Sequence, residues 1–324
     1  MIGIRKEEVT MGKTPPAKKR WFGQEVMHLI KNRELLSIAS PGLLFILVIG
    51  YLPMIGLILA FKRYRYDLGI LGSKWVGFDN FEFLFKSHDA TRIIRNTLLY
   101  NCVYIIIGTA VALLFALLLN ELTGRMVKIY QTTMFLPFFI SMVLVGYITS
   151  AYLDHTNGFL NAILKTIGLE PHKWYFETTP WLFILPVVAI WKSVGFSTLI
   201  YYAGIIGISS DYYEAARLDG ASRIQMMVHI TLPLIKPLVI ILFILGLGNI
   251  FRGDFGLHYF VPNKVGLNFP TTDIIDTYVY RALSKNGNID SATAVGFLQS
   301  VVGLVTIVSA NFLVRKVNKE NALF

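Results

Sequence analysis

Residues 214–237 read EAARLDGASRIQMMVHITLPLIKP, a polar stretch that lies between two apolar segments of the chain. Asp211, just before it, has a side chain that can cap a helix start, and Glu214 follows three residues later, where it can return a hydrogen bond to the backbone of the cap. Gly220 favours the left-handed conformation in which many helices end. The stretch therefore predicts a short helix near 212–218.

A second capping pattern follows directly. Ser222 and Gln225 have the same spacing, so a second helix should start near 223 and run toward Pro233. Two short helices joined at Gly220 form a compact knob. Small side chains let another protein approach the backbone of this knob closely; they are Ala215, Ala216 and Ala221. We expect the knob to contact a partner protein.

The composition places the chain in a lipid bilayer. Of its 324 residues, 54% are hydrophobic and only 15% are charged, which lies outside the range of soluble domains. The net charge of +10 would suggest a nucleic-acid partner in a soluble protein, but here the basic residues crowd the N-terminal tail and the loop edges. We expect no nucleic-acid partner. The single cysteine, Cys102, can form no intrachain disulfide or metal cluster.

Uncharged apolar runs of about 20 residues, the length that crosses a bilayer, occur six times. They cover about 42–61, 97–119, 130–153, 181–202, 234–250 and 295–314. The fifth is the least regular, because Pro233, Lys236 and Pro237 stand at its start. Continuous runs of this length fit helices rather than barrel strands. We therefore expect an all-α, polytopic membrane protein with six transmembrane helices.

The first 36 residues indicate the orientation of the chain. They are rich in lysine and arginine and lack the apolar core and cleavage site of a signal peptide, so the N-terminus should stay in the cytoplasm. Six crossings then place the loops 120–129 and 203–237 inside, together with the C-terminal tail. The first outer loop also carries seven basic residues, which reduces the charge asymmetry. We expect two parts, which are a cytoplasmic basic tail at 1–39 and a six-helix transmembrane domain at 40–324 with a cytoplasmic loop at about 209–237.

The tail and the outer segments carry further patterns. An interfacial helix is predicted in the tail from Trp21, Phe22, Val26, Met27, Leu29 and Ile30, and a disordered tail is the alternative for residues 1–20. A short amphipathic helix is predicted between Gly158 and Gly168. The segment 251–294 mixes aromatic and polar side chains. The outer segments could dock an extracytoplasmic partner, or their aromatics could form an ordinary interfacial belt.

The polar stretch resembles the cytoplasmic EAA loop of ABC importer permeases. The resemblance rests on Glu214, Ala215, Ala216, Asp219, Gly220 and Ala221, followed by Ile230, Leu232, Pro233 and Pro237. Residues 75–85, WVGFDNFEFLF, are similar to the Gly-x-x-Asn-aromatic stretch of carbohydrate importer permeases. Met226 and Met227 depart from the family, which often carries an aromatic residue near this position. The resemblance implies the type I importer permease fold and a place in the bacterial inner membrane, with both termini in the cytoplasm.

The resemblance also implies partners. The loop would insert into a cleft of an ATP-binding subunit, with Glu214 supplying a charged contact and Gly220 permitting the bend. Two ATP-binding subunits, a homologous second permease and an extracytoplasmic solute-binding protein would complete the importer. No GxxxxGK[ST] phosphate loop occurs in the chain, so ATP and Mg²⁺ would be bound by the partner and this chain would hold no cofactor. No catalytic motif and no set of metal ligands occurs either, so we do not expect an enzyme.

The cargo is suggested mainly by resemblance to permeases that import oligosaccharides, including polyuronates such as alginate or pectin fragments. Lys192 adds to this, because a cation in the middle of the fourth span is costly and usually faces a cavity or a counter-ion. It could attract a carboxylated sugar, or pair with an acidic side chain or a helix carbonyl of the partner permease. Asn249 and Gln299 are further candidates for the translocation path, although interhelical hydrogen bonding is the commoner role of such groups.

Three other functions compete with this one. An importer of the same build could carry a peptide or another solute that is not a carbohydrate. An ion-driven secondary transporter should show inverted repeats and several charged spans, and we find no internal repeat. A membrane-embedded enzyme would need a cluster of catalytic groups, which the sequence does not offer.

Overall fold

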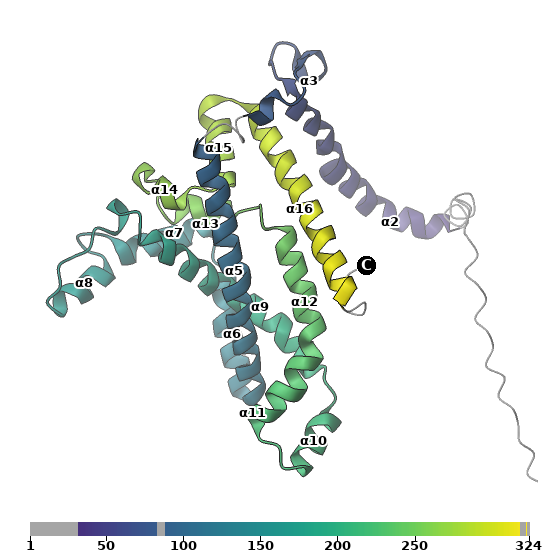
Figure 1. Cartoon of the computed structure of the whole chain (residues 1–324), viewed down its shortest axis with the longest axis vertical. Coiled ribbons are helices and arrows are strands. Elements are labelled where there is room, and N and C mark those ends of the chain that lie inside the picture. Colours follow the sequence, from purple (N-terminus) through teal and green to yellow (C-terminus); the bar gives the residue numbers. More distant parts are fainter. Residues whose placement is uncertain (1–31, 83–87, 318–321, 323–324) are drawn as a thin grey trace, which may run out of the picture. The chain divides into compact units, whose positions relative to one another are not determined.

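The computed structural model describes residues 32–82, 88–317 and 322, and these residues are almost entirely helical (Figure 1). The only strands in this part of the chain are β1 (Lys62–Arg63) and β2 (Lys74–Trp75), which pair antiparallel. The expected all-α class is thus confirmed. The chain divides into two compact units, Met1–Gly56 and Leu57–Phe324.

The first apolar run forms a continuous helix from Arg33 to Phe61, long and apolar enough to cross a membrane. It consists of α2 (Arg33–Ile46), the π-helical turn η1 (Leu47–Tyr51) and the 3-10 helix η2 (Leu52–Phe61). The expected span at 42–61 therefore starts earlier, at Arg33. The interfacial helix that the sequence predicts between residues 21 and 30 lies outside the described residues.

Four more helices are long and apolar enough to span a bilayer. They are formed by α5 (His88–Glu121), by α9 (Trp181–Ile206), by the run Arg223–Gly248, and by α16 (Ile289–Val317). Three of them contain an expected span whole, and the run Arg223–Gly248 ends two residues before the expected end of the fifth span at 250. α5 packs along α9, and α9 packs along α6. Gly195 allows that second approach, because a Cβ atom there would clash with the carbonyl oxygen of Met134.

The third expected span is not one continuous helix. It consists of α6 (Arg125–Phe139) and α7 (Met142–Leu153), which meet at an angle of 99°. Pro137 lacks an N–H for the helix ladder, and Ile140 is extended. The hydroxyl of Ser141 then starts the new helix by accepting a bond from the Leu144 N–H at 3.3 Å. An apolar run predicts that a segment lies within the bilayer, but it does not show where a helix breaks.

The fifth span differs from the prediction at its start. The second knob helix and the expected span at 234–250 are parts of one run, which contains α11 (Arg223–Met226), the π-helical turn η5 (Met227–Thr231) and α12 (Leu232–Gly248). Pro233 lies in the first turn of α12, where its missing N–H is tolerated. The sequence suggested that the second knob helix ends near Pro233. In the structure the helix continues past both prolines.

The connections opposite the knob contain short elements. The first holds α3 (Gly69–Gly72) and η3 (Asp79–Phe81), the second holds α8 (Phe159–Thr166) and η4 (Trp174–Phe176), and the third holds α13 (Phe255–Phe260), η6 (Gly266–Asn268), α14 (Phe269–Thr272) and α15 (Ile275–Asn286). The amphipathic helix expected between Gly158 and Gly168 is present as α8. Within the second unit, α10 (Ser210–Leu218) and α11 lie at the end opposite α13–α15 (Figure 1).

The Gly-x-x-Asn-aromatic stretch closes the end of the first helix. Gly77 adopts a φ of +62°, and Asn80 donates hydrogen bonds to the carbonyl oxygens of Ala60 at 3.0 Å and Lys62 at 2.8 Å. Phe81 is buried in a cluster with Ala60. Since carbonyls at a helix end lack partners in the helix, the motif supplies a cap and a hydrophobic anchor.

Candidate functional site: knob, inter-helix groove and outer anchor

The first helix of the knob, α10, starts at Ser210 and ends at Leu218. Its cap is Ser209, whose hydroxyl accepts a bond from the Asp211 N–H at 3.3 Å. The prediction of Asp211 as the cap is therefore wrong, because a serine two residues earlier occupies the extended position that a cap requires. Gly220 has a φ of +78°, as predicted for the bend.

The second capping pattern is confirmed. The hydroxyl of Ser222 accepts a bond from the Gln225 N–H at 3.3 Å, and the Gln225 side-chain oxygen accepts one from the Ser222 N–H at 2.8 Å. This reciprocal pair begins α11. The bend at Gly220 and the box at Ser222 together fix the turn between the two helices of the knob.

All six predicted contact residues lie at or near the surface of the knob. The side chains of Glu214, Ala215, Asp219 and Gly220 are exposed, and Ala216 and Ala221 are half-buried. Two apolar side chains stand out more, because Leu218 is 89% exposed and Ile224 is 72% exposed. Sequence reasoning missed both, since a single leucine or isoleucine in a helix usually predicts burial. Both side chains add apolar surface to an otherwise polar loop.

Two contacts hold the knob against the membrane part of the chain. Arg223 of α11 forms an ion pair with Glu121, at the end of α5, with 3.1 Å between the atoms. Tyr213 of α10 and Thr231 of η5 share a hydroxyl hydrogen bond of 2.9 Å. A cavity of about 600 Å³ lies between these elements, and Glu214 is among its lining residues. These two contacts therefore connect the knob to the end of α5 and to η5.

Lys192 lies in α9, and its ammonium group donates a hydrogen bond to the carbonyl oxygen of Phe138 at 3.0 Å. The same group lies 5.7 Å from the centre of the Phe138 ring. Phe138 is at the end of α6, next to the break of the third span, where carbonyls carry the partial negative charge of the helix end. The structure thus pairs Lys192 with a helix carbonyl, but with one of its own chain.

Asn249 and Gln299 line the same groove, although they are far apart in the sequence. The groove lies between the end of α12 and α16 and has a volume of about 560 Å³. Arg252 and Ser300 also line it. Two of the three predicted path residues therefore lie together, and Lys192 is not among the lining residues. Arg252 is exposed, and no carboxylate among the described residues lies within ion-pair distance of it.

Close helix packing shapes this groove. A Cβ atom on Gly303 would lie 2.7 Å from the carbonyl oxygen of Gly248, so α12 and α16 approach each other at these two glycines. Above the crossing, the Gln299 amide donates to the carbonyl oxygen of Phe251 at 2.8 Å and to the Asp276 carboxylate at 3.2 Å. Burial raises the pKa of Asp276. Gln299 is thus both a wall of the groove and a link between the helices.

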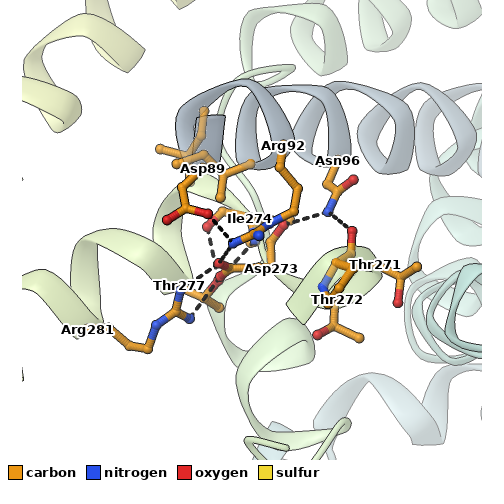
Figure 2. Close-up of polar contacts among 12 residues, drawn as sticks. Asp89, Arg92, Asn96, Thr271, Thr272, Asp273, Ile274, Thr277 and Arg281 are labelled. Carbon is orange, nitrogen blue, oxygen red and sulfur yellow. Dashed lines mark hydrogen bonds and ion pairs between the residues drawn. The ribbon is translucent and has the colours of Figure 1, made fainter. Parts of the chain in front are cut away.

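A buried ionic cluster, here called the outer anchor, consists of Arg92, Asn96, Asp273, Thr277 and Arg281 (Figure 2). The side chain of Asp273 is fully buried. Its two oxygens receive the fork of Arg281 at 2.8 and 2.5 Å, and the hydroxyl of Thr277 donates at 2.7 Å.

The outer anchor joins segments that are far apart in the chain. Arg92 of α5 lies 3.7 Å from Asp273 and 3.0 Å from Asp89. The Asn96 amide donates to the carbonyl oxygens of Pro270 and Asp273, both at 3.0 Å (Figure 2). The anchor therefore fixes the start of α5 to the connection between α14 and α15. Sequence reasoning did not identify it.

His258 forms a second link at the same end. Burial lowers its pKa to about 4, so the ring is neutral near pH 7. One ring nitrogen lies 2.8 Å from the carbonyl oxygen of Thr272, and the other lies 3.0 Å from the hydroxyl of Tyr104. The first nitrogen must donate, since a carbonyl can only accept, and the second accepts from the tyrosine.

The described residues contain no group of three or more histidine, cysteine, aspartate or glutamate side chains arranged to hold a metal ion. The chemistry of the three regions is that of contact and positioning. The knob presents a mixed apolar and acidic surface, the groove presents polar side chains with one cation, and the outer anchor fixes helix ends.

Comparison with known proteins gives a consistent result. Residues 95–319 match a family model described as "Binding-protein-dependent transport system inner membrane component". The chain is 36% identical to the polygalacturonan/rhamnogalacturonan transport system permease protein YteP of Bacillus subtilis, with 94% of each chain covered. It is 35% identical to protein LplB of the same organism, over 90% of this chain and 92% of LplB.

A solved structure is similar over nearly the whole chain. It is a chain of a bacterial ABC transporter involved in the import of the acidic polysaccharide alginate, and it matches with a TM-score of 0.81 and 33% identity. The match covers 91% of this chain and 99% of that one. The same kind of transporter has also been solved in complex with a periplasmic protein that holds an alginate pentasaccharide.

Proposed function

Because this chain belongs to the family of binding-protein-dependent transport system inner membrane components, we propose that it is a permease subunit of an ABC importer for acidic oligosaccharides. Its cargo would be delivered by an extracytoplasmic solute-binding protein, and a homologous second permease would complete the path. The relatives support the class of cargo. Two of the proteins similar to it are described as serving polygalacturonan or rhamnogalacturonan and alginate.

The knob is proposed to couple transport to ATP hydrolysis in two partner ATP-binding subunits, which would also bind ATP and Mg²⁺. Exposed Leu218 and Ile224 would supply apolar contact area, and Glu214 and Asp219 would supply charge. The Glu121–Arg223 pair would pass a movement of the knob to α5. With the knob in the cytoplasm, both termini lie on the cytoplasmic side, and α13–α15 lie outside.

One observation supports the acidic cargo above the others, namely the position of Arg252 in the groove with Asn249 and Gln299. Amide and hydroxyl groups suit the hydroxyls of a sugar, and a guanidinium group binds a carboxylate with two parallel hydrogen bonds. The volume of about 560 Å³ holds several sugar-sized groups rather than one ion. Since Lys192 is bound to the end of α6, Arg252 is the better placed of the two cations to meet a uronate.

The test is import of a uronate oligosaccharide and a neutral oligosaccharide of equal length by the reconstituted importer. Arg252→Gln should lower uronate import about tenfold, the scale of one lost charge-assisted contact, and change neutral import less than twofold. Arg252→Lys should retain part of the uronate import. Arg125→Gln, which removes an exposed arginine at the start of α6, is the matched control.

Two results contradict the proposal. If Arg252→Gln lowers import of both oligosaccharides equally, Arg252 does not recognise the carboxylate of the cargo. If the wild-type importer carries the neutral oligosaccharide but not the uronate, the proposal of an acidic cargo is itself wrong. A neutral oligosaccharide or a solute that is not a carbohydrate would then be the cargo to test next.

A further inference from the structure

A second pocket lies away from the groove, between α13, α14 and α15. Its volume is about 140 Å³. Lys264 and Tyr259 line it on the side of α13, Tyr280 and Ser284 line it on α15, and Arg281 and Asp273 of the outer anchor are also among its lining residues. The proposed function uses none of the first four. The helices α13–α15 lie at the opposite end of the second unit from α10 and α11 (Figure 1).

The charges of the outer anchor are already satisfied within the chain. Arg281 directs both arms of its fork to Asp273, and its guanidinium carbon lies 4.2 Å from the centre of the Phe269 ring. Figure 2 shows these contacts converging on Asp273. His258, another lining residue, is neutral and bonded at both ring nitrogens. These groups leave little capacity to bind an incoming ion.

Lys264 differs from them. Asn263 and Lys264 both have positive φ angles, +54° and +58°, which residues other than glycine rarely adopt. This turn places the ammonium group 4.6 Å from the centre of the Tyr259 ring and 6.0 Å from that of Phe260. The side chain is exposed, and no carboxylate within the described residues forms an ion pair with it. A strained turn therefore holds an unpaired cation against aromatic faces.

The surroundings of Lys264 resemble the centre of a protein contact. Tyr259 packs against Phe255 and Tyr280, with ring centres 4.8 and 5.0 Å apart. Tyr280 is 40% exposed, and the adjacent Leu283 on α15 is 46% exposed. Tyrosine and other apolar groups around a charged contact exclude water from it, which strengthens the contact.

We propose that this pocket, here called the Lys264 notch, receives an acidic side chain of the solute-binding protein when that protein docks. The proposal rests on the proposed function, which places α13–α15 outside the membrane. Size favours a side chain over cargo, because the notch, at about 140 Å³, is much smaller than the groove, at about 560 Å³. One aspartate or glutamate side chain suits a recess of this size better than an oligosaccharide does.

The test measures the affinity of the complete importer in lipid nanodiscs for the binding protein that supports its transport. Lys264→Gln should weaken binding about tenfold, and Lys264→Glu should weaken it further, because a like charge then faces the acidic partner. Lys264→Arg should stay within about threefold of the wild type, since it keeps the charge. Wild-type affinity should fall with added salt, and Lys264→Gln should show a smaller salt dependence.

Arg125→Gln is the control, because it removes another exposed cation, at the start of α6, from outside the segments that could dock the binding protein. Its affinity should equal that of the wild type. A scan of single aspartate and glutamate residues to lysine on the binding protein should find one whose loss of binding is restored by Lys264→Glu. Such a suppressor would identify the partner side chain.

Each result separates the notch from the proposed function. If Lys264→Glu binds the binding protein as tightly as the wild type, the notch is overturned, although cargo import through Arg252 stands. If Lys264→Gln leaves that affinity unchanged but lowers uronate import selectively, the notch contacts cargo and the docking proposal is overturned. If the wild-type importer binds no such protein and imports no oligosaccharide, the proposed function itself fails.

Discussion

The outer anchor and the knob lie at opposite ends of the second unit. The carboxylate of the anchor is buried and bonded within the chain, whereas those of the knob are exposed. In the anchor, Asp273 is fully buried and receives Arg281 and Thr277 within 2.8 Å. In the knob, Glu214 and Asp219 are exposed to solvent. A charge that the chain satisfies by itself fixes a structure, and a charge that the chain leaves exposed is available to another molecule.

The same distinction separates four arginines and lysines of the second unit. Arg281 and Lys192 are bound within the chain, to a carboxylate and to a helix carbonyl. Among the described residues, no carboxylate lies within ion-pair distance of Arg252 or Lys264, although the charge of Arg252 acts on the Asp276 carboxylate. Both cations line a concavity. On the two proposals, Arg252 would meet the cargo and Lys264 would meet a docking protein, so substitutions in the two groups should have different effects.

The largest effect should come from the outer anchor. Asp273→Ala removes the counter-ion of Arg281 and leaves a desolvated cation, a change that typically costs 3–5 kcal/mol, or about 4 kcal/mol as a central value. We expect the variant to unfold at a much lower temperature or to fail to accumulate in the membrane. Thermal unfolding of the purified importer, followed by tryptophan fluorescence, measures this.

Asp219→Ala in the knob is the control for the anchor. Its side chain is exposed, so its free energy of unfolding should change by less than about 0.5 kcal/mol. Equal stability of Asp273→Ala and Asp219→Ala would contradict the contrast between the two ends. Asp273→Asn should fall between them, because the amide keeps one acceptor for Arg281 but loses the charge.

The next effect concerns the bend of the knob. Gly220→Val forces a β-branched residue into a φ of +78°, which costs about 1–2 kcal/mol locally and should displace α10 from α11. Transport should then fall while the importer still assembles and hydrolyses ATP. Gly220→Asn is the matched control, since asparagine tolerates this conformation and should keep most of the transport. Similar transport by both variants would show that the bend is not required for coupling.

The knob was predictable from the sequence because its signals are local. The box of Ser222 and Gln225 and the bend at Gly220 involve residues within a few positions of each other, and both are confirmed. The wrong prediction of the α10 cap is also a local matter, since Ser209 and Asp211 lie two positions apart and either side chain could cap the helix. The six apolar runs likewise predicted the helices, because hydrophobicity over 20 residues reflects the bilayer and needs no knowledge of packing.

The outer anchor was not predictable, because its partners are distant in the chain. The Asn96 amide and the Asp273 carbonyl are separated by 177 positions, and only the fold brings them together. The groove was not predictable for the same reason. Asn249 and Gln299 stand out in the sequence as polar residues in apolar runs, but only the fold shows that they line one groove with Arg252. The break in the third span also depends on context, since Pro137 alone does not end a helix of this kind.

Lys192 combines the two cases, because it is a charge inside a span with a backbone partner. If its role is to satisfy the end of α6 at the break, Lys192→Met removes that bond, leaves the Phe138 carbonyl without it, and weakens the link between α6 and α9 by about 1–2 kcal/mol. Import of uronate and neutral oligosaccharides should then fall equally, by a few-fold. Arg252→Gln, in contrast, should affect the uronate alone.

The two cargoes measured side by side therefore decide what Lys192 does. A loss confined to the uronate would place Lys192 on the translocation path with the cations that cargo meets, despite its bond to Phe138. An equal loss, together with partial rescue by Lys192→Arg, would place it with Arg281 as a cation that fixes helix ends, because arginine can still donate to the carbonyl. The second outcome would show that this charge within a span serves the fold, because the chain itself provides a partner for it.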